Sequence, residues 1–211
     1  MSNAIRGFLV LLCLLTLSGA AVSEGFNDNY IEVGYKTDNT KFVDNGILLK
    51  ASKKLDNDLI ISGAYQHLKG DWNDPGEYEV ATRTDYVLGI GKSYSVNSET
   101  EILAELGIDH LVSKKVCTPT TGVCGVYSDG GKSSGNFYYT AVALRRHINN
   151  STDGLVKYYK TIPGSLSLKV VLASVQLVTK ISKDKSIVVD YLTNVDATYF
   201  KEYSVSIRHS F

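Results

Sequence analysis

The chain has 211 residues, enough for one compact domain or at most two small ones, and its charges balance at 22 Lys and Arg against 22 Asp and Glu. Hydrophobic residues at 44% and charged residues at 21% exclude a disordered chain and a polytopic helical membrane protein. Without an excess of positive charge, nucleic acid is not an expected partner. The 14 Tyr and 18 Gly favour strands and tight turns over helices.

Residues 1–23 have the pattern of a secretory signal peptide. Arg6 supplies the positive charge, residues 8–17 form an apolar run, and small residues follow at 18–21. Cleavage is expected after Ala20 or after Ser23. A run of about ten apolar residues is too short to cross a bilayer as a helix, so the segment is not expected to remain as an anchor.

The rest of the chain, residues 24–211, is predicted to form one all-β domain of ten strands. Stretches of alternating hydrophobicity are separated by Asn, Asp, Gly and Ser clusters. The predicted strands are 29–36, 44–55, 58–68, 77–94, 98–112, 135–148, 154–162, 165–181, 185–194 and 199–211. Eight strands remain the alternative if 155–162 and the segment after Gly164 form loop or one irregular strand.

The connections between these strands fall into two sets. Tight turns are expected at 56–57, 96–97, 149–153 and 183–184, whereas the other set, at 37–43, 69–76, 113–134, 163–164 and 195–198, contains the two longest loops. Short turns at one end and longer loops at the other are typical of an antiparallel up-and-down transmembrane β-barrel.

The alternation separates apolar from charged side chains. In 98–112, Ile102, Leu106 and Ile108 share one face, while Glu101, Glu105 and Asp109 share the other. A soluble sandwich would bury the apolar face, and a membrane barrel would turn it to lipid. Strands of 11–17 residues favour the barrel, because soluble strands usually have about five or six.

In a barrel the charged face would line the lumen. The predicted lumen residues are Glu32, Lys50, Glu79, Arg83, Asp85, Glu101, Glu105, Asp109 and Arg208. The lumen of such a small barrel is narrow, so these residues form either an ion-pair network that fills it or a polar path for ions or a small solute.

Two cysteines remain after the signal segment, Cys117 and Cys124, and a disulfide between them is expected in an exported chain. A zinc site has no third ligand nearby, so no metal and no cofactor is predicted. His209 and Ser210 are adjacent and would point to opposite faces of a strand, and no Gly-x-Ser-x-Gly motif occurs. The sequence therefore gives no support for an enzyme.

The last nine residues place apolar or aromatic residues at alternate positions up to a terminal Phe. This pattern resembles the final strand of bacterial outer-membrane β-barrels, and the architecture is similar to small barrels of the OmpA, OmpX and opacity-protein type. The alternate positions of this insertion signal are Tyr203, Val205, Ile207, His209 and Phe211, where His209 departs from the usual apolar residue.

The resemblance implies a monomer in the outer membrane of a Gram-negative bacterium, in contact with lipid and with the barrel-assembly machinery through its last strand. It implies a structural or surface-interaction role, in envelope integrity, adhesion or host-factor binding, through loops 69–76 and 113–134. A narrow pore is the alternative, and a lipid-modifying or proteolytic barrel enzyme is the less favoured one.

Overall fold

The computed structural model describes residues 26–39, 45–74, 77–119, 131–165, 170–196 and 200–211. Within them ten strands follow one another along the chain. The strands are β1 Tyr30–Asp38, β2 Asn45–Lys54, β3 Leu59–Asp74, β4 Glu77–Asn97, β5 Thr100–Pro119, β6 Lys132–Asn149, β7 Thr152–Ile162, β8 Val171–Lys180, β9 Lys185–Asn194 and β10 Lys201–Ser210. The prediction of ten strands rather than eight is confirmed.

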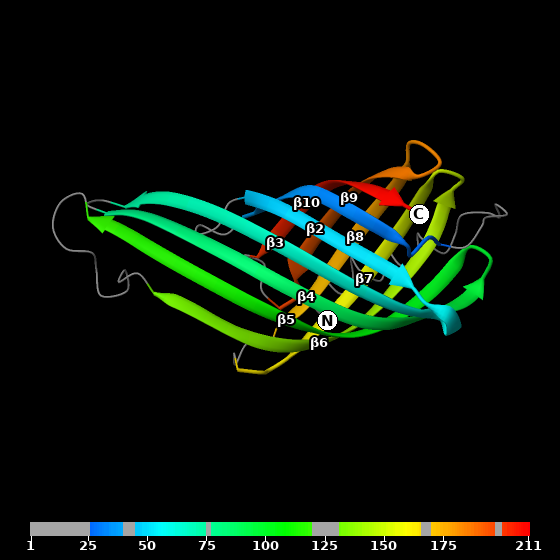
Figure 1. The fold of residues 1–211 in the computed structure, drawn as a ribbon, viewed down its shortest axis with the longest axis horizontal. Coiled ribbons are helices and arrows are strands. Elements are labelled where there is room, and N and C mark those ends of the chain that lie inside the picture. Colours follow the sequence, from blue (N-terminus) through cyan, green and yellow to red (C-terminus); the bar gives the residue numbers. More distant parts are fainter. Residues whose placement is uncertain (1–25, 40–44, 75–76, 120–130, 166–169, 197–199) are drawn as a thin grey trace.

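The strands close into a single barrel (Figure 1). Each strand pairs antiparallel with its neighbours in sequence, and β1 pairs with β10 from Tyr30 opposite Ser210 to Asp38 opposite Glu202. A closed ring satisfies backbone hydrogen bonds between strands without leaving an open edge, which is what a sheet needs in order to cross hydrocarbon. The predicted antiparallel up-and-down barrel is therefore confirmed.

Short connections gather at one end of the barrel, here called the short-turn end. One is the 3-10 turn Asp56–Asp58, in which Asn57 and Asp58 have φ of 68° and 61°. Asn and Asp tolerate this left-handed backbone better than most residues. The start of β1 and the end of β10 lie at the same end, at the right of Figure 1.

One side of the barrel is much taller than the other. Strands β3 to β6 have 16, 21, 20 and 18 residues, whereas the other six have 9 to 11. Pairing of β2 with β3 stops at Asn45 and Lys69, and pairing of β6 with β7 stops at Tyr138 and Ile162. Beyond those points the sheet continues as four strands, here called the projecting sheet: 70–74, 77–82, 113–119 and 132–137 (Figure 1).

The projecting sheet corrects the prediction of long loops at 69–76 and 113–134. The strands on both sides of each segment continue their backbone pairing, with Asp74 opposite Glu77 and Lys114 opposite Lys132. These segments are mostly polar and glycine residues in sequence, so the regular apolar alternation weakens before the strands end. Residues 75–76 and 120–130 lie outside the described part.

The predicted strand 165–181 also begins later, at Val171. Gly164 and Ser165, at the start of the predicted strand, lie against Asn136 of β6 instead of joining the sheet. A Cβ at Gly164 would lie 2.3 Å from the carbonyl oxygen of Asn136, and the Ser165 hydroxyl accepts a hydrogen bond from the Asn136 amide at 2.8 Å. The Pro163-Gly164 turn therefore lies against the edge of β6, where only glycine fits.

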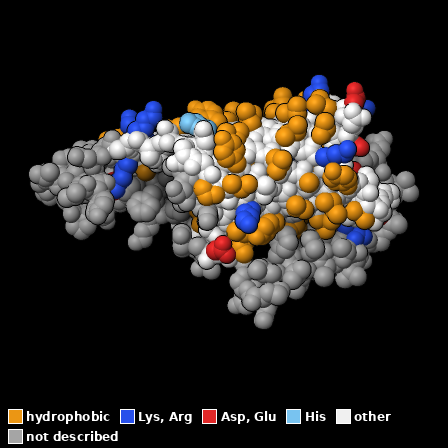
Figure 2. Space-filling view, turned by 90° about the horizontal axis from the view of Figure 1, so that it is seen from below, with side chains coloured by type: hydrophobic (Ala, Val, Ile, Leu, Met, Phe, Trp, Pro, Cys, Tyr) orange, Lys and Arg blue, Asp and Glu red, His pale blue; other side chains and the backbone are white. Residues whose placement is uncertain are grey.

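The apolar face of the barrel points outward (Figure 2). On β10, Tyr203, Val205 and Ile207 are 46–59% exposed, while the alternate residues Ser204 and Ser206 are buried. The other described strands carry exposed large hydrophobic side chains in the same way. Such an extended apolar surface suits lipid and not water. Inside, Ile60, Leu103 and Ala143 form only a small apolar cluster.

Candidate functional site

The lumen is the candidate site, because the strands direct most of the buried charged side chains into it. Closure of the sheet brings together residues far apart in sequence, and these residues form four groups between the tall end and the short-turn end.

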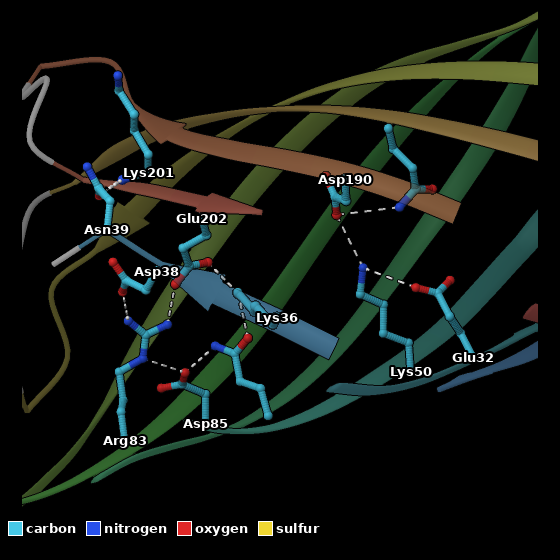
Figure 3. A network of polar contacts seen from close by, with 12 residues as sticks. Glu32, Lys36, Asp38, Asn39, Lys50, Arg83, Asp85, Asp190, Lys201 and Glu202 are labelled. Atoms are coloured by element: carbon cyan, nitrogen blue, oxygen red, sulfur yellow. Dashed lines mark hydrogen bonds and ion pairs between the residues drawn. The ribbon is translucent and has the colours of Figure 1, made fainter. Parts of the chain in front are cut away.

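The first group, here called the upper cluster, surrounds Arg83 of β4 (Figure 3). Its guanidinium contacts Asp38 of β1 at 3.2 Å, Asp85 at 3.0 Å and Glu202 of β10. Lys36 forms a second ion pair with Glu202. Since β4 and β10 are four positions apart in the ring, this cluster crosses the lumen. Gln66 completes it by donating to Asp85 and accepting from Lys36.

The second group centres on Glu32 of β1, which is fully buried. Arg208 of β10 donates to the Glu32 carboxylate from Nε at 3.0 Å and from Nη2 at 2.8 Å, and the Ser206 hydroxyl donates at 2.7 Å. Lys50 of β2 lies 3.6 Å from Glu32 and 3.3 Å from Asp190 of β9 (Figure 3). Two carboxylates and two cations thus neutralise one another across four strands.

The third group lies on the facing wall. Glu105 of β5 accepts hydrogen bonds from the Tyr139 hydroxyl and from Lys157 Nζ, the latter at 2.8 Å. Gly89 and Gly107 oppose each other on β4 and β5, and a Cβ at Gly107 would come within 2.3 Å of the Tyr139 ring. The two glycines therefore make the space in which this ring lies.

The fourth group closes the short-turn end. Arg145 of β6 binds both carboxylate oxygens of Asp28 and donates to Glu101 at 2.6 Å. All three side chains are buried. His147 Nδ1 lies 2.5 Å from Asp153, and its ring stacks on Phe26.

Outside the lumen, the Ser182 hydroxyl donates to Asp184 and holds the pKa of that exposed carboxyl below its usual range.

A cavity of about 320 Å³ lies between these groups. Charged and aromatic side chains of the second and third groups line it, together with aliphatic residues such as Ile60, Leu103 and Leu155. The cavity lies within the size range of small-molecule pockets. It is walled by polar and apolar groups together, so its shape alone selects no ligand.

The predicted lumen residues do not form one network. Glu32, Lys50 and Arg208 lie in the second group, Arg83 and Asp85 in the upper cluster, Glu105 in the third group and Glu101 in the fourth. Glu79 is buried on the projecting sheet and pairs with Lys115 at 2.8 Å. Asp109 lines the cavity, and its Oδ1 has no hydrogen-bond partner among the described residues.

Several members of these groups were not in the predicted set: Asp28, Lys36, Asp38, Gln66, Tyr139, Arg145, Lys157, Asp190 and Glu202. Three of them share a strand face with a predicted residue: Lys36 and Asp38 with Glu32, and Glu202 with Arg208. The others on strands lie on β3, β6, β7 and β9, for which no lumen residue was predicted. Applying the period-2 alternation to those strands was the signal that would have found them, whereas Asp28 precedes β1 and carries no such signal.

Other predicted features receive no structural description. The signal peptide (1–23), the Cys117 side chain and Cys124 lie outside the described residues, so the disulfide stays a prediction. In the part of the chain that is described, no group of three His, Cys, Asp or Glu is arranged to hold a metal ion. No helix in that part is long and apolar enough to cross a membrane.

No protein-family model and no curated protein matches the sequence. Solved structures match in fold. The NanC porin is 11% identical over 86% of this chain and 100% of its own, at a TM-score of 0.51. The KdgM porin is 12% identical over 86% of this chain and 99% of its own, at a TM-score of 0.45. Ail, the attachment invasion locus protein of Yersinia pestis, is 14% identical over 88% and 98%, at a TM-score of 0.38.

The closed ring, its outward apolar face and the likeness to NanC decide the architecture. The chain has the fold of a small outer-membrane β-barrel. At 11% identity the likeness concerns the fold, so what the barrel does has to be argued from its own residues.

Proposed function

We propose that the chain is an integral outer-membrane barrel with a structural or surface-interaction role, and that the projecting sheet is its contact surface. The observation that carries this proposal is the difference in strand length. A strand needs about 9–11 residues to cross the bilayer at a tilt. Strand β4 has 21 residues, and β5 has 20. About half of each strand is therefore in excess of what lipid requires.

The projecting sheet is held by polar contacts that do not need lipid. The Tyr78 hydroxyl donates to Asp71 at 3.0 Å, and Lys115 pairs with Glu79 at 2.8 Å. These contacts join β3 to β4 and β4 to β5, so the strands support one another in water. A sheet held in place by its own contacts can present a fixed surface to a partner at little cost in ordering.

The content of the lumen supports a structural role over free passage. The upper cluster and the Glu32 group place ion pairs across the barrel, and their side chains are largely buried. In an eight- to ten-stranded barrel such side chains fill most of the interior.

Orientation is tested by labelling intact cells with a membrane-impermeant thiol reagent. In a chain whose Cys117 and Cys124 are replaced by Ser, we compare Lys132→Cys on the projecting sheet with Lys183→Cys at the short-turn end, both exposed. We expect labelling of Lys132→Cys alone on intact cells and of both after lysis. Labelling of Lys183→Cys alone on intact cells would place the projecting sheet in the periplasm and overturn the surface role.

A narrow pore is the second candidate, and the 320 Å³ cavity inside the lumen favours it. The purified barrel in a planar bilayer separates the two. A barrel filled by ion pairs gives no steady current, whereas a pore gives one that scales with salt concentration.

A further inference from the structure

Residues 26–29, directly before β1, lie across the mouth of the barrel at the short-turn end. In the ring, β1 and β6 are five positions apart in either direction, so they face each other across the lumen. Phe26 and Asp28, directly before β1, nevertheless contact Arg145 and His147 of β6. The segment Phe26–Asn29 therefore spans the mouth from one wall to the other.

Side chains hold the far end of this segment. The Asp28 carboxylate accepts hydrogen bonds from both Nη atoms of Arg145, the one from Nη2 at 2.9 Å. Asp28 is 4% exposed and Arg145 is 7% exposed. The Phe26 ring stacks on the His147 ring with centroids 4.0 Å apart, and the Arg145 guanidinium lies 4.9 Å from the Phe26 ring. A bidentate, buried pair of this kind is among the stronger polar contacts in proteins.

Hydrogen bonds from backbone amides of the barrel hold only the near end of this segment, at Asn29. The Asn29 carbonyl accepts from the Phe211 amide at 3.1 Å, and the Asn29 side chain accepts from the Lys54 amide at 2.9 Å. Phe26, Asn27 and Asp28 make no backbone hydrogen bond to the barrel wall among the described residues. The segment is thus anchored at Asn29 and attached elsewhere by two side chains, which is the arrangement of a hinged flap and not of a strand.

Open space lies on both sides of the segment. On its inner side is the 320 Å³ cavity, lined by Phe26, Asn27 and Asp28. On its outer side is a recess of about 120 Å³, lined by Asn27 and by short-turn residues such as Lys183 and Ser210. The two spaces share four lining residues: Asn27, Asp153, Val178 and Arg208. Of these four, Asn27 belongs to the segment and the other three to the barrel wall, so Asn27 lies between the cavity and the recess.

We propose that Phe26–Asn29 is a displaceable plug that closes the periplasmic mouth of the cavity, and that small polar solutes reach the cavity when it swings out about Asn29. The proposal requires a folded barrel, and its periplasmic side rests on the orientation proposed above, whereas opening of the segment is tested in micelles whatever that orientation is. It assigns a gated, periplasm-facing chamber to a lumen that is otherwise filled by ion pairs.

The test measures access to the cavity with a small charged methanethiosulfonate reagent. Ser174 of β8 lines the cavity and is 3% exposed, so Ser174→Cys reports entry of the reagent. The reporter is placed in a chain with Cys117→Ser and Cys124→Ser, folded in detergent micelles and checked by its gel mobility before and after boiling. The plug is weakened by Phe26→Ala, by Asp28→Ala, and from the wall side by Arg145→Met.

Glu79→Ala is the matched control, because it also removes a buried carboxylate from an ion pair but lies on the projecting sheet. We expect each plug variant to raise the modification rate by roughly tenfold or more, since that rate follows the population of the open state. The control should leave the rate unchanged.

Three results would overturn the proposal. They are an unchanged rate in folded Phe26→Ala and Asp28→Ala, an equal rise in Glu79→Ala, or modification of the parent reporter as fast as an exposed cysteine. Phe26→Ala breaks no ion pair, so it keeps the test decisive if Arg145→Met does not fold. The gel-mobility check separates these outcomes from failure of the barrel itself.

Discussion

At the scale of single residues, the fit of Tyr139 between two strands depends on Gly107. A Cβ at this position would lie 2.3 Å from the ring, so Gly107→Ala must displace Tyr139 and break its hydrogen bond to Glu105. Overpacking of this kind typically costs about 1–3 kcal/mol. Urea unfolding in lipid vesicles should show this loss of stability.

Gly63→Ala is the matched control for Gly107→Ala. Its added Cβ would meet the nearest atom, Leu88 Cδ2, at 3.6 Å, which is an ordinary contact. We expect its unfolding midpoint to stay close to that of the parent. If both variants lose the same stability, a general glycine effect and not the Tyr139 site would explain the result.

The buried Glu32 carboxylate lies between two cations of the lumen, Arg208 and Lys50. Glu32→Ala leaves Arg208 and Lys50 facing each other in the lumen without the carboxylate that separates them. Removing one partner of a buried ion pair costs about 3–5 kcal/mol. Asp184→Asn serves as the control, because Asp184 and its partner His209 are both about half exposed at 47% and 54%. Its effect on the unfolding midpoint should be slight, and a comparable loss in both variants would refute the argument.

At the scale of elements, the proposed orientation takes β5 from lipid into water along a single face. Leu106 and Val116 both lie on its outward face, at 60% and 41% exposed. Leu106 is in the membrane-crossing part, whereas Val116 belongs to the projecting sheet. Arginine at the bilayer midplane of a barrel costs about 2–4 kcal/mol and little near the interface. Leu106→Arg should therefore destabilise the folded barrel in vesicles, and Val116→Arg should not.

The contrasting outcome for β5 is equally specific. If Val116→Arg destabilises as much as Leu106→Arg, the projecting sheet lies in lipid and the barrel sits deeper than proposed. Folding yield and urea midpoint in vesicles, measured for both variants, decide between these placements.

The strands also show how far the sequence could predict this molecule. Ten strands follow from period-2 alternation, whereas the outward direction of their apolar faces was predicted from strand length and from the pattern of the last strand. The upper ends of β3 to β6 were missed, because segments such as 69–74 and 113–115 are mostly polar in sequence and lose the alternation. There the strand forms because it pairs with the neighbouring strand, and such pairing cannot be seen in a local sequence pattern.

The same limit applies to the lumen. Alternation tells that Arg83 and Asp85 share the inward face, but not that Arg83 meets Glu202, which is 119 residues away. That contact exists only because β1 pairs with β10 and closes the ring. Likewise, nothing in the local composition of Phe26–Asn29 indicates that this segment reaches β6 on the opposite wall.

At the scale of the whole molecule, the barrel is closed by one seam. Every other pair of neighbouring strands is joined by a connection in the chain, but β1 and β10 are the first and last strands, so the ring is closed only when these two pair. Phe211 lies at this seam, where its amide donates to the Asn29 carbonyl at 3.1 Å and its side chain is 62% exposed. The terminal residue thus joins the seam and extends the outward apolar row of β10.

Deletion of Phe211 should lower the level of the protein in the outer membrane and leave an unclosed fraction. An unclosed sheet has two edges and no resistance to SDS, so it should migrate alike whether boiled or not. Phe211→Tyr is the control, because it keeps the backbone donor and the aromatic ring and should assemble like the parent. Equal levels and equal gel shifts for the deletion and the control would show that the seam closes without Phe211, and that the likeness of the last strand to an insertion signal has no consequence for assembly.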